Sequence, residues 1–258
     1  MKPGYVVVWR LVLLAAILAA WQSVSSSKTL AFYVSSPSAI WNRELQWIAD
    51  GTIWFHTFIT VEETVAGFAC GAIAGIAAGF ILGPNRTLGA VLDPFIISVY
   101  SIPKVALAPL FIVWFGVGLT MKVVLATVTV FFIVFFNTLA GVRNVDPDLV
   151  NAVWLMGGDS RTILLKVIVP HAMSSALTGA RIAIPYALIG AVVGELIASN
   201  RGIGYLIESA ASQFDTAGVF AALIVLTILA TILNALVDAI DRYTSRWKVE
   251  ANLSLRMN

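Results

Sequence analysis

The sequence predicts an all-α, polytopic membrane protein of about six transmembrane helices, and three observations lead to this fold class. Hydrophobic residues make up 59% of the 258 residues and charged residues only 12%, too little charge to cover the surface of a soluble domain of this size. Several apolar stretches reach the roughly 20 helical residues that a hydrocarbon core requires. They are continuously apolar and lack the alternation of a membrane β-barrel. We therefore treat residues 1–258 as a single transmembrane domain.

Turn-forming residues delimit the expected spans. The spans cover residues 5–22, 62–82, 92–114, 120–141, 172–198 and 217–240. Gly83-Pro84-Asn85-Arg86 and Gly116-Val117-Gly118 make the two short turns around the third span, since Gly and Pro interrupt helices. Asp146-Pro147 ends the fourth span and opens a longer loop, because Pro is favoured in the first turn of a helix. Arg201-Gly202-Ile203-Gly204 begins the loop before the last span.

The N-terminal region has two interpretations. Lys2, Arg10 and the stretch Ser23-Val24-Ser25 give residues 5–22 some character of a signal peptide. We favour a retained span, because the rest of the chain is itself a membrane protein. The segment 38–60 is less apolar and carries Trp47, Trp54 and Phe55, so an amphipathic helix at the membrane interface is expected there.

The placement of Lys and Arg sets the expected orientation. With the N-terminus inside, the outer side receives only Lys28, Arg43, Lys122 and Arg201, and Lys104 falls within a span. The inner side receives Lys2, Arg10, Arg86, Arg143, Arg161, Lys166, Arg181, Arg242, Arg246, Lys248 and Arg256. The positive-inside rule therefore predicts that both termini, the tail 241–258 and the loop 147–170 are cytoplasmic.

The loop 147–170 is expected to form a helical hairpin. A first helix from Pro147 to Met156 would present apolar side chains to the cytoplasm, and Gly157-Gly158 would reverse the chain. A second helix, Thr162–Val169, would then lead to Pro170 at the membrane. The apolar side chains are Leu149, Val150, Val153, Trp154 and Met156. An exposed apolar helix implies a groove on a partner protein. The alternative is a hairpin that folds back onto the spans.

Four motifs occur in a fixed order. The loop has the spacing Asn151-Ala152-Val153, three residues, Gly157, nine residues, Val167, one residue, Val169-Pro170. The other motifs are Ser101–Leu110 with Trp114-Phe115-Gly116-Val117-Gly118, Gly194-Glu195-Leu196-Ile197, and Gly202-Ile203-Gly204-Tyr205-Leu206-Ile207. Over residues 37–248 the chain resembles the permease subunits of nitrate/sulfonate/taurine/bicarbonate-type ABC importers.

The resemblance implies a plasma (inner) membrane location and several partners. These are a second copy of the chain, two cytoplasmic ABC ATPases and an extracytoplasmic substrate-binding protein. It also implies that the loop residues couple to the ATPase: Asn151, Ala152, Val153, Trp154, Gly157, Val167 and Pro170. Asn151 departs from the pattern, because the family loop usually opens with Glu, and Val153 replaces the usual second Ala. The chain has no G-x-x-x-x-G-K-[ST] motif, so we expect ATP to bind to a partner and no cofactor or catalytic residue here.

Polar residues within spans are candidates for the solute path. Lys104 lies between Pro103 and Pro109 and could attract an anion, or could pair with Glu195 or Asp93, or reach the interface. Glu195 could serve transport, contact Arg201 or meet the binding protein. Asn137, with Thr138, could line the pore, but interhelical hydrogen bonds are favoured.

The remaining features favour structural roles. Gly67, Gly71, Gly75 and Gly79 share one helix face, which favours close helix packing within the subunit or across a dimer. Cys70 is the only cysteine, and His56 and His171 fall on opposite membrane sides, so no metal site is expected. The small net charge of +2 gives no indication of nucleic-acid binding.

The leading hypothesis is a permease subunit for a small, anionic solute. A transporter driven by an ion gradient is one alternative, although no cluster of intramembrane carboxylates is evident in the sequence. A membrane enzyme or scaffold is the second alternative, although no catalytic constellation converges at one membrane depth.

Overall fold

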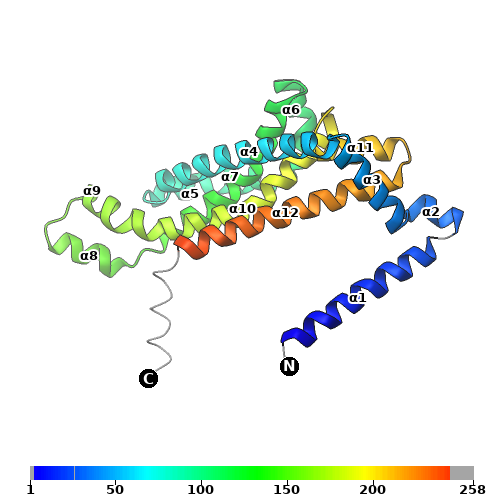
Figure 1. Ribbon diagram of the computed structural model, residues 1–258. Coiled ribbons are helices and arrows are strands. Elements are labelled where there is room, and N and C mark those ends of the chain that lie inside the picture. Colours follow the sequence, from blue (N-terminus) through cyan, green and yellow to red (C-terminus); the bar gives the residue numbers. More distant parts are fainter. Residues whose placement is uncertain (1–2, 26, 245–258) are drawn as a thin grey trace. The chain divides into compact units, whose positions relative to one another are not determined.

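The computed structural model describes residues 3–25 and 27–244, and all regular elements within them are helices (Figure 1). Most of the predicted tail 241–258 lies outside these residues, as do Lys2, Arg246, Lys248 and Arg256. The helices are α1 (Pro3–Val24), α2 (Lys28–Val34), α3 (Pro37–Ala49), α4 (Thr52–Leu82), α5 (Arg86–Ser101), the 3₁₀ turn η1 (Lys104–Leu107), α6 (Ala108–Phe115), α7 (Leu119–Arg143), α8 (Pro147–Leu155), α9 (Ser160–Ile163), the π-helical turn η2 (Leu164–Ile168), α10 (Val169–Ala198), α11 (Ile203–Ser212) and α12 (Thr216–Thr244).

The predicted membrane fold is confirmed. In the described residues, five helices are long and apolar enough to cross a membrane, and a sixth span results when the bent pair α5 and η1–α6 is counted as one. The described residues form two compact units, which divide the chain between residues 59 and 60, 199 and 200, and 228 and 229. The helices α4 and α12 contribute residues to both units.

The first unit is held together by contacts between its N-terminal helices and α11–α12. Trp21 of α1 meets Phe220 of α12 edge to face, with ring centroids 5.5 Å apart. Arg43 of α3 forms an ion pair with Asp215 at 2.8 Å. His56 accepts a hydrogen bond from the Gly202 N–H at 2.9 Å. These contacts join α1, α3 and the start of α4 to residues 202–220.

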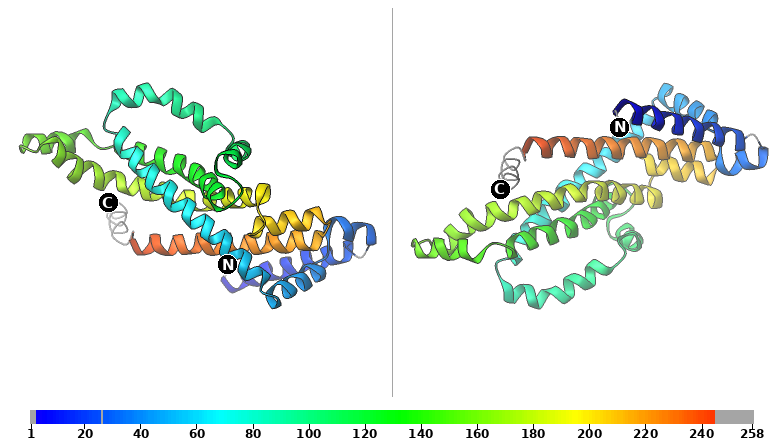
Figure 2. Two further views of the ribbon diagram at one scale, coloured as in Figure 1. Left: turned by 90° about the horizontal axis from the view of Figure 1, so that it is seen from above. Right: turned by 90° about the horizontal axis from the view of Figure 1, so that it is seen from below.

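The second unit is built on α7 and α10, which run side by side in both views of Figure 2. Small residues allow the two helices to approach closely: Ala126 of α7 and Ala183, Ala187 and Ala191 of α10 are fully buried. A side chain on Gly190 would lie 2.7 Å from the Ala126 Cα. This pair is the core against which the other elements of the unit pack.

The glycine face of α4 packs against α7 within the same chain. A Cβ on Gly67 would lie 2.4 Å from the Ala126 Cβ, and a Cβ on Gly71 would lie 2.6 Å from the Thr127 carbonyl oxygen. Gly75 and Gly79 approach α7 equally closely. Larger residues would therefore force the two helices apart.

The second span begins earlier than expected. The segment 38–60 is not one interfacial helix: α3 ends at Ala49, and α4 starts at Thr52 and includes Trp54 and Phe55. The break follows from Gly51, whose φ of +82° favours glycine. It also follows from Asp50, the C-cap of α3, whose Oδ1 accepts the Thr52 N–H at 2.9 Å where α4 begins.

The third span, expected at 92–114 as one helix, is bent. The helices α5 and η1–α6 meet at 83°, and Figure 2 shows the arc that they form beside α7. Pro103 has no N–H to donate and disfavours helical geometry at the preceding residue, so Ile102 is extended with ψ of 126°. The chain resumes helical structure only at Lys104.

Candidate functional site

The loop after the fourth span folds into a helical hairpin that projects beyond the ends of α7 and α10 (Figure 2). Its first helix, α8, begins as predicted at Pro147. The Asp146 carboxylate accepts the Asp148 N–H at 2.8 Å and caps the helix. The Pro147 ring fits the first turn because a missing N–H costs nothing there.

The turn at the end of α8 is a Schellman motif. The Gly158 N–H donates to the Val153 carbonyl at 2.9 Å, and the Gly157 N–H donates to the Trp154 carbonyl at 3.0 Å. Gly157 has a φ of +81°, which glycine adopts at little cost. A Cβ on Gly158 would lie 2.5 Å from the Val153 Cγ1. Gly157 is therefore required by its positive φ, and Gly158 by the lack of room for a side chain.

The returning limb starts at a second cap. Asp159 Oδ1 accepts the Thr162 N–H at 2.9 Å and the Thr162 hydroxyl at 2.6 Å. These two hydrogen bonds, the side-chain bond first, lower the pKa of the Asp159 carboxyl from its ordinary value of 3.8. The cap fixes the direction in which the chain leaves the turn.

The returning limb differs from the predicted helix Thr162–Val169. It runs through α9 and the π-helical turn η2 into α10, in which Pro170 occupies the first turn. The Val169 N–H donates to the Leu164 carbonyl five residues back. A π-helical turn of this kind shifts the hydrogen-bond ladder just before a residue without an N–H. Val167 lies within this turn and is half-buried.

The far end of α8 is apolar and exposed. Leu155 and Met156 are 89% and 87% exposed, and Trp154 and Leu149 are also exposed. Of the other residues predicted to couple, Asn151 and Ala152 are exposed and Val153 packs against Gly158. Leu155 was not among the predicted residues, although its place at the helix end beside Met156 could have indicated it.

Lys104 lies at the bend between α5 and α6. Its ammonium donates a hydrogen bond to the Tyr100 carbonyl and lies 4.2 Å from the centroid of the Tyr100 ring and 5.4 Å from that of Phe132. Neither expected acid contacts it: Asp93 pairs with Arg143 at 3.8 Å, and Glu195 is buried elsewhere. The positive charge of Lys104 is therefore stabilised by the Tyr100 carbonyl and by the faces of the Tyr100 and Phe132 rings.

Asn137 and Thr138 make no hydrogen bond between helices in the part of the chain that the structure describes. The Asn137 amide donates to the Ile133 carbonyl at 2.8 Å, and the Thr138 hydroxyl donates to the Val134 carbonyl at 2.8 Å. Both bonds lie within α7. The expected interhelical bonds are replaced by close packing, since a Cβ on Gly179 of α10 would lie 2.5 Å from the Asn137 Cβ.

A buried polar cluster joins α4, α7 and α10, and sequence reasoning missed most of it. Glu195 is 1% exposed and accepts the Thr60 hydroxyl at 2.7 Å. Lys122, 2% exposed, forms an ion pair with Glu63, 1% exposed, and donates to the Ser199 hydroxyl at 3.1 Å. Lys122, counted on the outer side at the start of the fourth predicted span, is thus buried among helices and paired with an acid.

No group of three or more His, Cys, Asp or Glu residues that could hold a metal ion occurs in the described residues. His56 stacks on Tyr205, with ring centroids 5.7 Å apart, in addition to its bond with Gly202. The structural features that stand out are thus the capped hairpin and the polar residues within the spans.

Comparisons with known proteins agree with this architecture. Residues 67–247 match the family model described as "Binding-protein-dependent transport system inner membrane component". The riboflavin transport system permease protein of Chloroflexus aurantiacus is 34% identical over 92% of this chain and 89% of its own length. The putative aliphatic sulfonates transport permease protein of Bacillus subtilis is 31% identical over 96% and 91%. The taurine transport system permease protein of Escherichia coli is 30% identical over 92% and 88%.

Solved structures share the fold. A chain of the MetNI methionine ABC transporter in an inward facing conformation superposes with a TM-score of 0.61 at 21% identity, over 76% of this chain and 96% of that one. A chain of an amino acid ABC transporter gives the same TM-score at 16% identity, over 77% and 96%. The family match, the near full-length relatives and the shared fold agree: the chain belongs to the family of inner membrane components of binding-protein-dependent transport systems, as a permease subunit of an ABC importer.

Proposed function

We propose that the hairpin formed by α8 and α9 is the element through which a separate cytoplasmic ATPase drives this permease. The observation that carries the proposal is the exposed apolar end of α8. Leu155 and Met156 are almost fully exposed at the tip of a hairpin whose turn and caps are all satisfied internally. Such a surface on an ordered element fits a groove on a partner.

The proposed mechanism is a shift between two conformations. Closure of the ATPases on ATP moves the hairpin, and the hairpin tips the spans from an inward-facing to an outward-facing state. Hydrolysis resets the cycle. The returning limb supports this role, because its helical run into α10 gives the hairpin a direct mechanical connection to the core helix pair.

The proposed assembly contains two copies of this chain, two ATPases and an extracytoplasmic substrate-binding protein. Both termini and the hairpin face the cytoplasm, and the first span is retained. The excess of Lys and Arg on the inner side supports this orientation. The chain itself carries no P-loop motif, so the ATPases supply the ATP sites.

The proposed solute is small and carries a negative charge, and Lys104 contributes to its path together with Pro103, Asn137 and Glu195. In the described residues, Lys104 has no carboxylate partner, so its positive charge is not neutralised by an acid. Taurine and aliphatic sulfonates, which the names of two relatives give as their solutes, carry sulfonate groups.

The hairpin proposal is tested by co-purification with the ATPase. The chain is expressed with its ATPase partner, and a Leu155→Ser/Met156→Ser variant is compared with Leu165→Ser, which changes an exposed leucine on η2. We expect the double variant to lose the ATPase and the control to retain it. Equal retention by both variants would show that the apolar tip is not the docking element.

The solute proposal is tested by uptake into liposomes that contain the complete complex. Lys104→Met should lower the uptake of a sulfonate while ATPase association stays intact. Unchanged sulfonate uptake by Lys104→Met would contradict the role given to Lys104.

A further inference from the structure

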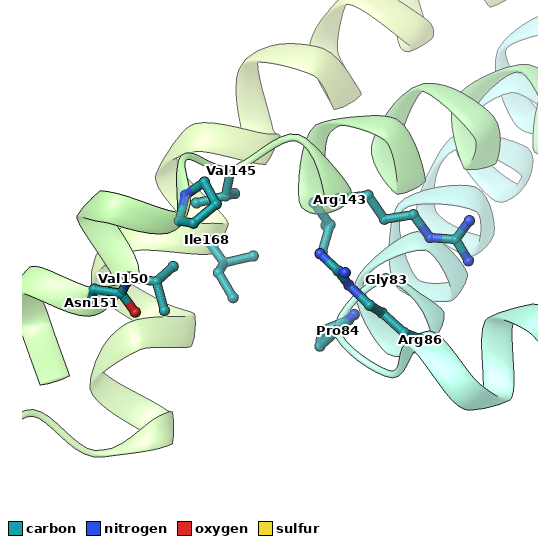
Figure 3. A pocket seen from close by; sticks show the side chains of 10 residues that line it. Gly83, Pro84, Arg86, Arg143, Val145, Val150, Asn151 and Ile168 are labelled. Atoms are coloured by element: carbon teal, nitrogen blue, oxygen red, sulfur yellow. The ribbon is translucent and has the colours of Figure 1, made fainter.

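In the described residues, a pocket with one unpaired cation lies at the base of the hairpin, away from the exposed tip at Leu155 and Met156. Its volume is about 290 Å³. Figure 3 shows Asn151, Val150, Val145 and Ile168 on one side and Arg86, Pro84 and Gly83 on the other. The pocket thus lies where the turn between α4 and α5 meets the base of α8.

Arg86 is the cation of this pocket. Its side chain extends toward the pocket in Figure 3, whereas the Arg143 guanidinium is directed away from it, toward α5. Arg143 has a partner there in Asp93, at 3.8 Å. In the described residues, Arg86 has no hydrogen-bond or ion-pair partner, and no Asp or Glu lines the pocket.

Two acids of the adjoining segments, Asp146 and Asp93, have other partners. The Asp146 carboxylate accepts the Asp148 N–H as the cap of α8, and Asp93 faces Arg143. The remaining lining is apolar apart from Asn151, whose amide carries N–H donors. A guanidinium, an amide donor and apolar walls together favour a ligand that combines an anionic head with a less polar body.

We propose that this pocket binds a phosphate group, with Arg86 as its principal cation and Asn151 as a second donor. Two sources have this chemistry. The pocket lies at the ends of α4 and α7, at the membrane boundary on the expected cytoplasmic side, where basic pockets receive the headgroups of anionic lipids. A soluble phosphate compound from the cytoplasm would make the same contacts. Bound phosphate would bridge the α4–α5 turn and the coupling hairpin.

The test measures binding to the full-length chain in two arms. In the first, native mass spectrometry counts phosphatidylglycerol that stays bound when the chain is released from mixed phosphatidylcholine and phosphatidylglycerol nanodiscs. In the second, inorganic phosphate is titrated in phosphatidylcholine nanodiscs, and amide exchange of α8 is the readout. Retention in the first arm identifies a lipid headgroup, and a response in the second identifies a soluble ligand.

Arg86→Gln should weaken the binding at least about tenfold, because a charge-assisted hydrogen bond is lost. Asn151→Glu should also weaken it, because a carboxylate opposite Arg86 competes with the ligand. Arg161→Gln is the matched control, since Arg161 is an exposed arginine on the same hairpin outside the pocket. Equal binding by Arg86→Gln and Arg161→Gln, or no binding in either arm, would overturn the proposal. None of these readouts depends on ATPase docking.

Discussion

At the scale of single residues, the Lys122–Glu63 ion pair is the most unusual feature of the spans. Both side chains are almost fully buried, and burying a charge is costly unless it is paired. Removing one partner leaves the other uncompensated, whereas removing both leaves only a change in packing.

Lys122→Met and Glu63→Gln should therefore each destabilise the protein by about 3–5 kcal/mol, and the double variant should lose less than the sum of the two. A double-mutant cycle of unfolding in detergent measures this coupling. Additive losses would show that the two charges do not interact in the folded protein.

The same pair shows where prediction from the sequence stops. Lys122 lies near the start of the fourth predicted span, where the sequence shows only a basic residue on the outer side. Its burial depends on Glu63, which lies on another helix and has no local signal. Lys104, by contrast, was recognised as unusual from its place between two prolines, but its contacts with Tyr100 and Phe132 are tertiary and could not be predicted.

At the scale of elements, the hairpin depends on one left-handed residue. Gly157 has a φ of +81° with open space around its Cα, so backbone strain and not lack of room limits substitution. Gly157→Ala should cost about 1–2 kcal/mol in the turn, whereas Gly157→Asn should cost less, because Asn tolerates this conformation.

The measurement for this prediction is the stimulation of ATPase activity by the binding protein in the reconstituted complex. Gly157→Ala should reduce the stimulation more than Gly157→Asn does. The reverse order would show that the side chain itself, and not the backbone, matters at this position.

The second cap of the hairpin should weaken in acid. Its hydrogen bonds lower the pKa of Asp159 in the folded protein, so their contribution is fully present above the ordinary value of 3.8 and is lost as the pH falls through the lowered pKa. Amide-exchange protection at Thr162, corrected for intrinsic rates, should fall in that range.

Asp159→Asn is the control for this effect, since an amide oxygen still accepts a hydrogen bond but does not titrate in that range. Its protection at Thr162 should not change with pH there. A matching fall in the variant would assign the effect to another group.

Several elements were predictable because their signals are local. The turn at Gly83-Pro84, the start of α8 at Pro147 and the reversal at Gly157-Gly158 follow from conformational preferences of the residues themselves. The 83° bend at Pro103 and the π-helical turn before Pro170 were not predicted. In both cases the proline was noted, but whether it ends, bends or shifts a helix depends on how its neighbours pack.

At the scale of the whole molecule, the hairpin of this permease has two distinct surfaces. The number of spans expected from the sequence agrees with the structure. The permease family expected from the sequence agrees with the family model and with the relatives. The outer face of the hairpin presents Leu155 and Met156, and its base holds the pocket at Arg86. One face is proposed to receive the ATPase, and the other a phosphate group.

The most direct test of the central claim is a cross-link from the hairpin tip to the ATPase. Cys70 is the only native cysteine, so a Cys70→Ala background allows single cysteines to be placed at Met156 and, as a control, at Leu165. We predict that Met156→Cys cross-links to the ATPase in membranes, with a yield that changes when ATP is added, and that Leu165→Cys does not. No cross-link at Met156 in a complex that still transports would contradict the coupling role of the hairpin.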